Sequence, residues 1–208
     1  MPQLRLCYFD FDYGRAEPAR IALSIADLPF EDDRIPYNDW LHRKDEMPFG
    51  AIPVLYVDGR PLAQSDAINR YVGKLAGLYP EDPWQAAMCD EVMGVVEDSF
   101  HQITHSFGLP EPETKARRAL MDTEILPRYM KRLGQILEEN GREFFADNRL
   151  TVGDLKVADW VQALQSGQLE YVRDNLPQLF APSLVEHAAR VKADPRVKAY
   201  YDRRAAVG

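Results

Sequence analysis

The spacing of apolar residues changes near residue 77, and this change constrains the fold more than any other feature of the sequence. Before it, strand-like runs at residues 4–9, 30–34, 54–57 and 61–63 alternate with helical patterns at 17–26 and from Ser65 onward. After the segment LYPEDP at 78–83, every strong apolar period is helical. The sequence therefore predicts an α/β domain of order βαβ-ββα with a mixed four-stranded sheet at 1–77, a linker at 78–83 and an all-helical domain at 84–208.

The helical half contains two long patterns and one strong start signal. Apolar residues from Met88 to Phe107 favour one face of a helix, and Thr114–Asn140 reads as a second helix that Pro127 interrupts or bends. In the segment LTVGDL (150–155), a threonine can cap the helix and an aspartate three residues later can return the bond, so we expect a helix from Val152. Short helices near 183–193 and 195–204 complete the prediction.

Composition excludes several classes of protein. The apolar fraction of 46% over 208 residues is ample for a packed core. A formal charge of −8 disfavours nucleic acid as a partner. The first residues lack the pattern of a secretory signal, and no apolar run is long enough to span a membrane. Cys7 and Cys89 form no CxxC or disulfide framework, so we expect a cytoplasmic protein without membrane partners.

Two short segments suggest a binding site in the first domain. Pro53 immediately precedes a predicted strand, where its missing N–H would be awkward within the ladder, and such a proline can be cis. Gln64 and Ser65 stand where the next helix begins. Free backbone N–H groups and the helix dipole at such an end can hold a carboxylate.

Several short motifs follow one another along the chain: Tyr8-Phe9, GRAEP at 14–18, Trp40, Lys44, PFG at 48–50, Ile52-Pro53, Asp58-Gly59 and Gln64-Ser65. Taken in this order they resemble the cytosolic glutathione transferases, and in particular the sigma class, which includes the haematopoietic type of prostaglandin D synthase. The likeness is specific across residues 4–76 and looser from 84 to 204. It implies a thioredoxin-like first domain, glutathione as co-substrate, a homodimer and transfer of the glutathione sulfur to apolar electrophiles.

The resemblance also assigns catalytic roles. Thiolate is the nucleophilic form of a thiol, whose ordinary pKa of about 8.5 leaves it mostly protonated at neutral pH. A hydroxyl that donates a hydrogen bond to the sulfur favours the thiolate. By resemblance Tyr8 is that donor, and Arg15 adds a permanent positive charge near the sulfur.

The resemblance also implies which residues bind the rest of glutathione, and they lie on several predicted elements. The tripeptide carries two carboxylates and an amine, so it needs cations, helix-end donors and an acceptor. Residues implied in glutathione binding are Tyr8, Trp40, Lys44, Ala51, Ile52, Pro53, Gln64, Ser65 and, from the partner subunit of a dimer, Asp98. Lys44 within HRKDE and Asp98 beside Glu97 are also compatible with plain solvated surface.

The second-substrate pocket is expected to involve Phe9, Phe11, Tyr13 and His105. The loop between Phe9 and Gly14 is one residue longer than the usual sigma pattern, and Tyr13 on this loop rivals Tyr8 as the donor to sulfur. We retain Tyr8 because its place at the end of a strand matches the family.

No metal is predicted, and Cys7 is not assigned catalysis. Asp10 and Asp12 lack further ligand spacing, and His101 and His105, four residues apart, lack a third ligand. Cys7 lies within a strand, whereas reactive cysteines of thioredoxin folds lie at the first helix N-terminus.

Three classes of function stay open from the sequence. The first is the transferase. The second is a glutathione-dependent isomerase or peroxidase of prostanoid or lipid hydroperoxide substrates. The third is a non-catalytic glutathione-binding or structural relative.

Overall fold

The computed structural model describes residues 2–141 and 143–206, so the predicted domain ends at residues 1 and 208 lie outside the described residues. Its contacts divide the chain into two compact units, Met1–Tyr79 with Pro195–Gly208, and Pro80–Asp194. The predicted domains instead assign the whole of 84–208 to one helical domain. The difference arises because the last helix, α10 (Pro195–Ala205), packs against the first, α1 (Glu17–Ile25).

The first unit is built on a four-stranded mixed sheet, which confirms the predicted fold class. Strands β1 (Leu4–Phe9), β2 (Phe30–Ile35), β3 (Val54–Val57) and β4 (Arg60–Ala63) lie in the order β2-β1-β3-β4. β1 is parallel to β2 and antiparallel to β3, which pairs antiparallel with β4. The edge strand β2 has the charged sequence FEDDRI, and charged side chains are a common protection of a sheet edge.

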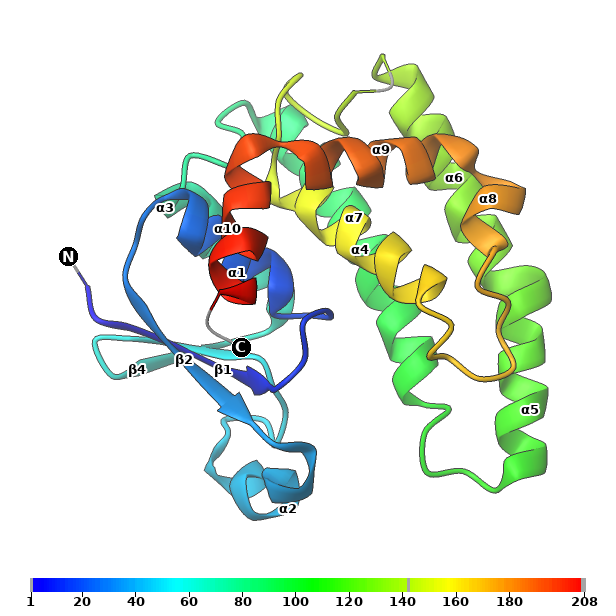
Figure 1. Ribbon diagram of the computed structural model, residues 1–208, viewed down its shortest axis with the longest axis horizontal. Helices are drawn as coiled ribbons and strands as arrows, with labels where there is room; N and C mark the ends of the chain where they lie inside the picture. The colour runs from blue at the N-terminus through cyan, green and yellow to red at the C-terminus, as the bar shows by residue number, and fades with distance from the viewer. Residues whose placement is uncertain (1, 142, 207–208) are drawn as a thin grey trace. The chain divides into compact units, whose positions relative to one another are not determined.

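Helices cover both faces of this sheet. Figure 1 shows α1, α3 (Ser65–Leu75) and α10 on one side of it and α2 (Trp40–Arg43) on the other. α2 is flanked by the 3₁₀ turns Tyr37–Asp39 and Lys44–Glu46, and together they form a stretch that we call the α2 segment (Tyr37–Glu46). The sequence patterns did not predict the α2 segment, because turns of three or four residues leave no apolar period to detect.

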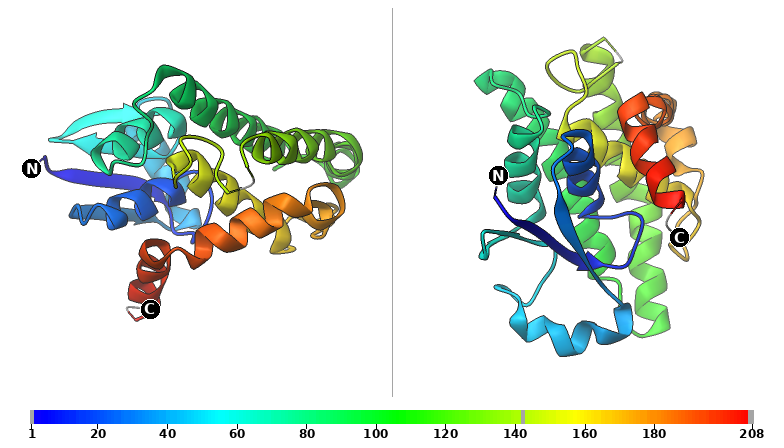
Figure 2. Two further views of the ribbon diagram at one scale, coloured as in Figure 1. Left: turned by 90° about the horizontal axis from the view of Figure 1, so that it is seen from above. Right: turned by 60° about the vertical axis from the view of Figure 1, so that its left-hand side comes forward.

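The second unit is a helical bundle. Its helices are α4 (Pro83–Thr104), α5 (Glu111–Leu120), α6 (Leu126–Glu139), α7 (Val152–Gln165), α8 (Leu176–Phe180) and α9 (Pro182–Ala193). In Figure 2, α7 runs between α4 and α9, in agreement with their contacts. The core of the bundle includes the fully buried side chain of Trp160 on α7, whose Nε1–H donates to Ser99 Oγ on α4 at 2.8 Å.

Two helix predictions need correction. The predicted face from Met88 to Phe107 overruns the helix: α4 ends at Thr104, and Phe107 is largely exposed beyond it. The predicted helix over Thr114–Asn140 is divided into α5 and α6 by a π-helical turn at Met121–Ile125. Pro127 lies in the first turn of α6, where its missing N–H is tolerated, so the interruption precedes the proline.

The start of α7 is formed as predicted. Thr151 Oγ1 accepts from the backbone N–H of Asp154, and the Asp154 carboxylate accepts from the backbone N–H of Thr151 at 2.8 Å. The same carboxylate accepts from Phe145 N–H and faces His187 Nε2, each at 2.9 Å. Asp154 is fully buried. Through Phe145 and His187 it joins the start of α7 to the preceding loop and to α9.

Candidate active site

The sheet register brings most of the predicted glutathione contacts to one end of the sheet. Cys7 in β1 pairs with Val54 in β3, and Val54 pairs with Ala63 in β4. Tyr8 follows Cys7, Pro53 precedes Val54, and Gln64 follows Ala63. Three segments far apart in sequence therefore meet where β1 ends, β3 begins and β4 ends.

Tyr8 lies at this end of β1 with its hydroxyl directed at the loop before α1. The backbone N–H of Arg15 donates to Tyr8 Oη at 3.3 Å, and the tyrosine is buried, with 7% of its surface exposed. A hydroxyl that accepts one hydrogen bond becomes a better donor of its own proton. This arrangement suits a phenol that donates to an anion.

Gly14 allows that close approach. Its φ is +93°, a conformation that L side chains rarely adopt, and a Cβ at this position would lie 3.1 Å from Tyr8 Oη. A side chain at residue 14 would therefore crowd the tyrosine hydroxyl.

The loop after Tyr8 carries a connected row of aromatic rings. Phe11 and Tyr13 are stacked with ring centroids 5.4 Å apart and planes within 4° of parallel. Phe9 contacts Phe11 at 5.3 Å and Trp40 at 5.5 Å between centroids. The row links the loop to the α2 segment, and its rings are partly exposed.

Charged residues that the sequence analysis did not single out hold this loop. The buried guanidinium of Arg20 donates to the carbonyl oxygens of Phe9 and Phe11, at 3.3 and 2.8 Å. Arg34 donates to Asp10 at 3.0 Å and Asp12 at 3.2 Å. Both acids thus pair with an arginine.

Trp40 and Lys44 both lie on the α2 segment, in its helix and in its last 3₁₀ turn. Trp40 is half-buried and packs against the small core formed by Cys7, Ile35, Met47 and Val54. Lys44 is exposed, and its aliphatic stem passes Gly50. The pair presents an indole and a cation from one short stretch of chain.

The peptide bond between Ile52 and Pro53 is cis, as the proline position suggested. Pro53 is buried, Ile52 is half-buried and Ala51 is exposed just before β3. The chain therefore passes from the surface at Ala51 into the core at Pro53 within this bend.

Gln64 has an unusual backbone conformation, with φ 74° and ψ 116° at the residue that caps α3. Such a conformation in a residue other than glycine is uncommon and clusters at functional sites. Ser65 is buried in the first turn of α3, and Gln64 is exposed. The start of α3 thus offers helix-end N–H groups beside two polar side chains, which fits a carboxylate.

Asp98 and His105 belong to the second unit. Asp98 is exposed, whereas the neighbouring Glu97 binds the buried Lys156 ammonium at 3.0 Å. His105 is exposed just after α4, and its Nδ1 lies 2.7 Å from the His101 carbonyl oxygen. The proximity of either residue to the sites of the first unit stays a prediction.

Both cysteines are buried. Burial, together with the hydrogen bond from Cys7 to Asp33, raises the pKa of the Cys7 thiol to about 12. Burial also raises the pKa of Cys89 to about 12. Neither thiol has the lowered pKa of a reactive cysteine.

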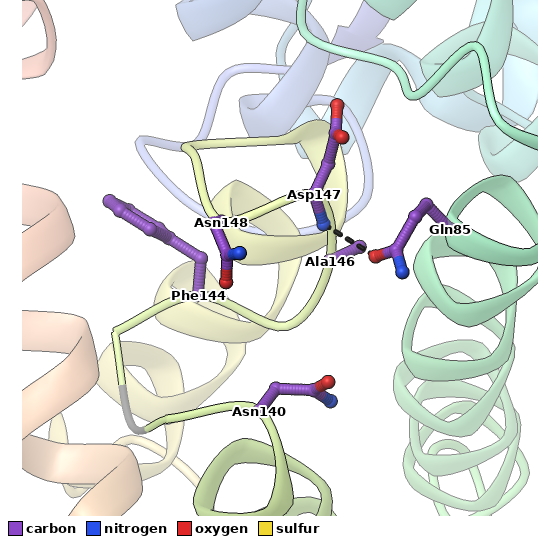
Figure 3. Close-up of a pocket in the computed structure, with 6 residues that line it drawn as sticks. All are labelled: Gln85, Asn140, Phe144, Ala146, Asp147 and Asn148. Atoms are coloured by element: carbon purple, nitrogen blue, oxygen red, sulfur yellow. Dashed lines mark hydrogen bonds between the residues drawn. The ribbon is translucent and has the colours of Figure 1, made fainter.

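A polar hollow of about 230 Å³ lies in the second unit, apart from every predicted site residue. Figure 3 shows its lining, with the backbone N–H of Asp147 donating to Gln85 Oε1 at 2.6 Å and the Phe144 ring turned away. Its lining residues are Gln85, Asn140, Phe144, Ala146, Asp147 and Asn148.

In residues 2–141 and 143–206, no group of three or more histidine, cysteine, aspartate or glutamate side chains is placed to hold a metal ion. Across the same part of the chain, no helix is long and apolar enough to cross a membrane.

Comparison with known proteins gives consistent matches along the chain. Residues 5–74 match the family model described as "Glutathione S-transferase, N-terminal domain", and residues 97–204 match "Glutathione S-transferase, C-terminal domain". A glutathione S-transferase of Anopheles gambiae is 32% identical over 209 residues, covering 98% of each chain.

Solved structures of similar proteins agree. Prostaglandin synthase D of Nilaparvata lugens has a TM-score of 0.86 at 30% identity and covers 98% of each chain. The monomeric Na-GST-3, a glutathione S-transferase of the hookworm Necator americanus, has a TM-score of 0.80 at 28% identity and covers 97% of each chain.

Proposed function

This chain belongs to the glutathione S-transferase family, a family of transferases, and from that premise we propose that it conjugates the glutathione thiolate to apolar electrophiles. The observation that carries the proposal is the meeting of Tyr8, the cis Ile52–Pro53 bend and the start of α3 at one end of the sheet.

In the proposed reaction, Tyr8 activates the thiol. Its O–H donates to the glutathione sulfur and stabilises the thiolate. The backbone N–H of Arg15 donates to the oxygen of the same hydroxyl and so polarises its O–H bond. The Arg15 guanidinium is proposed to add positive charge near the sulfur. The thiol proton leaves to solvent as the thiolate forms. Thiolate attack then forms a sulfur–carbon bond to the electrophile, and the electron pair of the broken bond leaves with the departing group.

The chemistry of the residues fits glutathione. We propose that Trp40 and Lys44 hold the glycyl carboxylate and that the backbone of Ala51, Ile52 and Pro53 pairs with the cysteinyl unit. Gln64 and Ser65, at the positive end of α3, suit the α-carboxylate of the γ-glutamyl group.

Further parts of the proposal concern assembly and location. We propose a cytoplasmic homodimer in which Asp98 contacts the γ-glutamyl amine bound by the partner subunit. The exposure of Asp98, beside a Glu97 already paired with Lys156, supports this choice of acid. Because one similar solved structure is described as monomeric, the oligomeric state needs its own measurement, such as light scattering.

For the second substrate we propose an apolar pocket that includes Phe9, Phe11, Tyr13 and His105. The partly exposed aromatic row of the first three supports an apolar, ring-containing electrophile. A sigma-type isomerase of prostanoid substrates is the second candidate, since a similar solved structure is a prostaglandin synthase D. Product analysis with a prostanoid endoperoxide separates the two.

The test of the transferase is conjugation of an aryl halide by wild type, Tyr8→Phe and Tyr13→Phe, with glutathione affinity measured in parallel. We expect Tyr8→Phe to bind glutathione normally but to lower kcat about 100-fold, as when one donor to a reacting anion is lost. Tyr13→Phe should retain near wild-type kcat.

Other results of this experiment would support a different catalytic residue or a different function. Equal activity of wild type and Tyr8→Phe, with loss in Tyr13→Phe, would transfer the role to Tyr13. An inactive wild type that still binds glutathione would favour the isomerase or a non-catalytic binding protein.

A further inference from the structure

The α2 segment has little stability of its own. It consists of a four-residue helix between two three-residue 3₁₀ turns, none of which has a side-chain cap. Single turns are unfavourable in isolation, because nucleation costs more than the first hydrogen bonds return. Contacts with the sheet must therefore determine where the α2 segment lies.

One carboxylate on the sheet makes such a contact. Arg43 Nη2, on the α2 segment, donates to Asp33 Oδ2 in β2 at 3.1 Å, and Arg43 Nε donates to Glu46 at 2.8 Å. From β1, Arg5 Nη1 and Cys7 Sγ donate to the same Asp33 oxygen, at 2.9 and 2.7 Å. We call Arg5, Cys7, Asp33 and Arg43 the Asp33 clamp.

The clamp is partly shielded from water, and its negative carboxylate faces two positive guanidinium groups. The side chain of Asp33 is only 16% exposed, with guanidinium groups from both β1 and the α2 segment on it. Burial alone would raise the pKa of Asp33, but the hydrogen bonds from Cys7, Arg43 and Arg5 outweigh it and lower the pKa. The carboxylate is thus charged at neutral pH, as a tether for arginine requires.

The position of Arg43 connects the clamp to the proposed glutathione contacts. Arg43 follows Trp40 by three residues, the spacing that places two helical residues on one side, and immediately precedes Lys44. Asp33 is held within the sheet. Its contact with Arg43 therefore fixes the distance of this helical turn from the sheet and the rotation of the turn about its axis.

We propose that Asp33 is a positioning residue that, through Arg43, holds Trp40 and Lys44 where they bind the glycyl carboxylate of glutathione. The inference rests on the proposed function and adds to it a residue that does not itself touch the substrate. Losing the clamp should weaken glutathione binding at its glycyl end and leave thiolate formation at Tyr8 unchanged.

The experiment compares two ligands by calorimetry. Glutathione has the glycyl carboxylate, whereas γ-glutamylcysteine lacks the whole glycyl unit and keeps the rest. We expect Asp33→Asn and Arg43→Gln each to weaken glutathione binding about tenfold, the lower range for losing a charge-assisted contact. Binding of γ-glutamylcysteine should stay within twofold of wild type. Asp45→Asn, an exposed charge change in the same segment, is the matched control and should change neither affinity.

Kinetics provide the second readout. In both clamp variants the KM for glutathione should rise while kcat at saturating glutathione and the pKa of the bound thiol stay as in wild type. A structural defect that spread through the domain would lower kcat and the affinity for γ-glutamylcysteine as well, and that result would overturn a positioning role.

The results distinguish failure of the positioning role of Asp33 from failure of the proposed transferase function. If wild type binds neither ligand, the proposed function fails. If wild type binds glutathione and both clamp variants bind it equally well, the inference fails and the function stands. If Asp33→Asn does not fold, Arg43→Gln decides the question alone, because Arg43 lies on the segment's surface with its side chain 31% exposed.

Discussion

Replacing Asp154 with alanine should destabilise the second unit far more than any surface change. The carboxylate caps α7 through Thr151 and accepts from Phe145 N–H and His187 Nε2, and the acid, Thr151 and His187 are all fully buried. Loss of the cap costs about 1 kcal/mol. Each of the two further buried donors left without a partner costs about 1–3 kcal/mol. Together these effects predict a loss of about 3–7 kcal/mol.

The assay is urea unfolding followed by the fluorescence of Trp160, the tryptophan buried in the bundle core. Glu111→Ala is the control: its side chain is 66% exposed and pairs with Lys115 at the surface, so its removal should leave the free energy of unfolding close to that of wild type. If Asp154→Ala unfolds with the same free energy as the control, the argument from buried donors is refuted.

A double variant tests the assigned mechanism. A carboxylate only accepts hydrogen bonds, so His187 Nε2 must carry the proton that faces Asp154. With His187→Leu present, no buried imidazole is left unpaired when Asp154 is removed. The double variant should therefore be less destabilised than the sum of the two single variants.

Other predictions follow from close contacts and from the buried thiols. Gly14→Ala should lower kcat/KM by more than tenfold in the conjugation assay, because its Cβ would lie 3.1 Å from Tyr8 Oη at a positive φ; an unchanged value would contradict the assigned site. Gly153→Ala should cost about 1–3 kcal/mol in urea unfolding, since its Cβ would meet side-chain atoms of α4 at 3.0 and 3.1 Å. Cys7 and Cys89 each have a pKa raised to about 12, so both thiols stay protonated at pH 8. Iodoacetamide should then label neither in the folded protein and both in urea, and mass spectrometry checks this.

The sheet and the α7 start could be predicted because their signals are local. Strand β1 occupies residues 4–9 as expected, and the capping box depends only on Thr151 and Asp154 within one turn. The run that marks a strand and the residue pair that caps a helix each lie within a few neighbouring residues, although the ladder itself pairs β1 with the distant β2 and β3.

The parts that could not be predicted depend on distant partners. Asp33 stands in the charged run EDDRI, where nothing in the sequence distinguishes it from a solvated acid; its partner Arg43 is ten residues away. The α2 segment has no periodicity, and the apolar period of α4 continues to Phe107, past the end of the helix at Thr104. The roles of Tyr8 and Trp40 came from a family resemblance, and the register then explains why the segments at Tyr8, Pro53 and Gln64 meet.

The division of the chain also bears on how the protein is made. The first compact unit includes α10, where Tyr200 Oη donates to the buried Glu17 of α1 at 2.9 Å. A ribosome delivers the sheet and α1 early, but α10 emerges only after the whole second unit has been synthesised. During translation, the surface of α1 that α10 later covers stays exposed to solvent until α10 has been synthesised. A chain released one helix too early would carry a complete sheet in which Glu17 keeps Arg20 as a partner but lacks Tyr200 and Arg204.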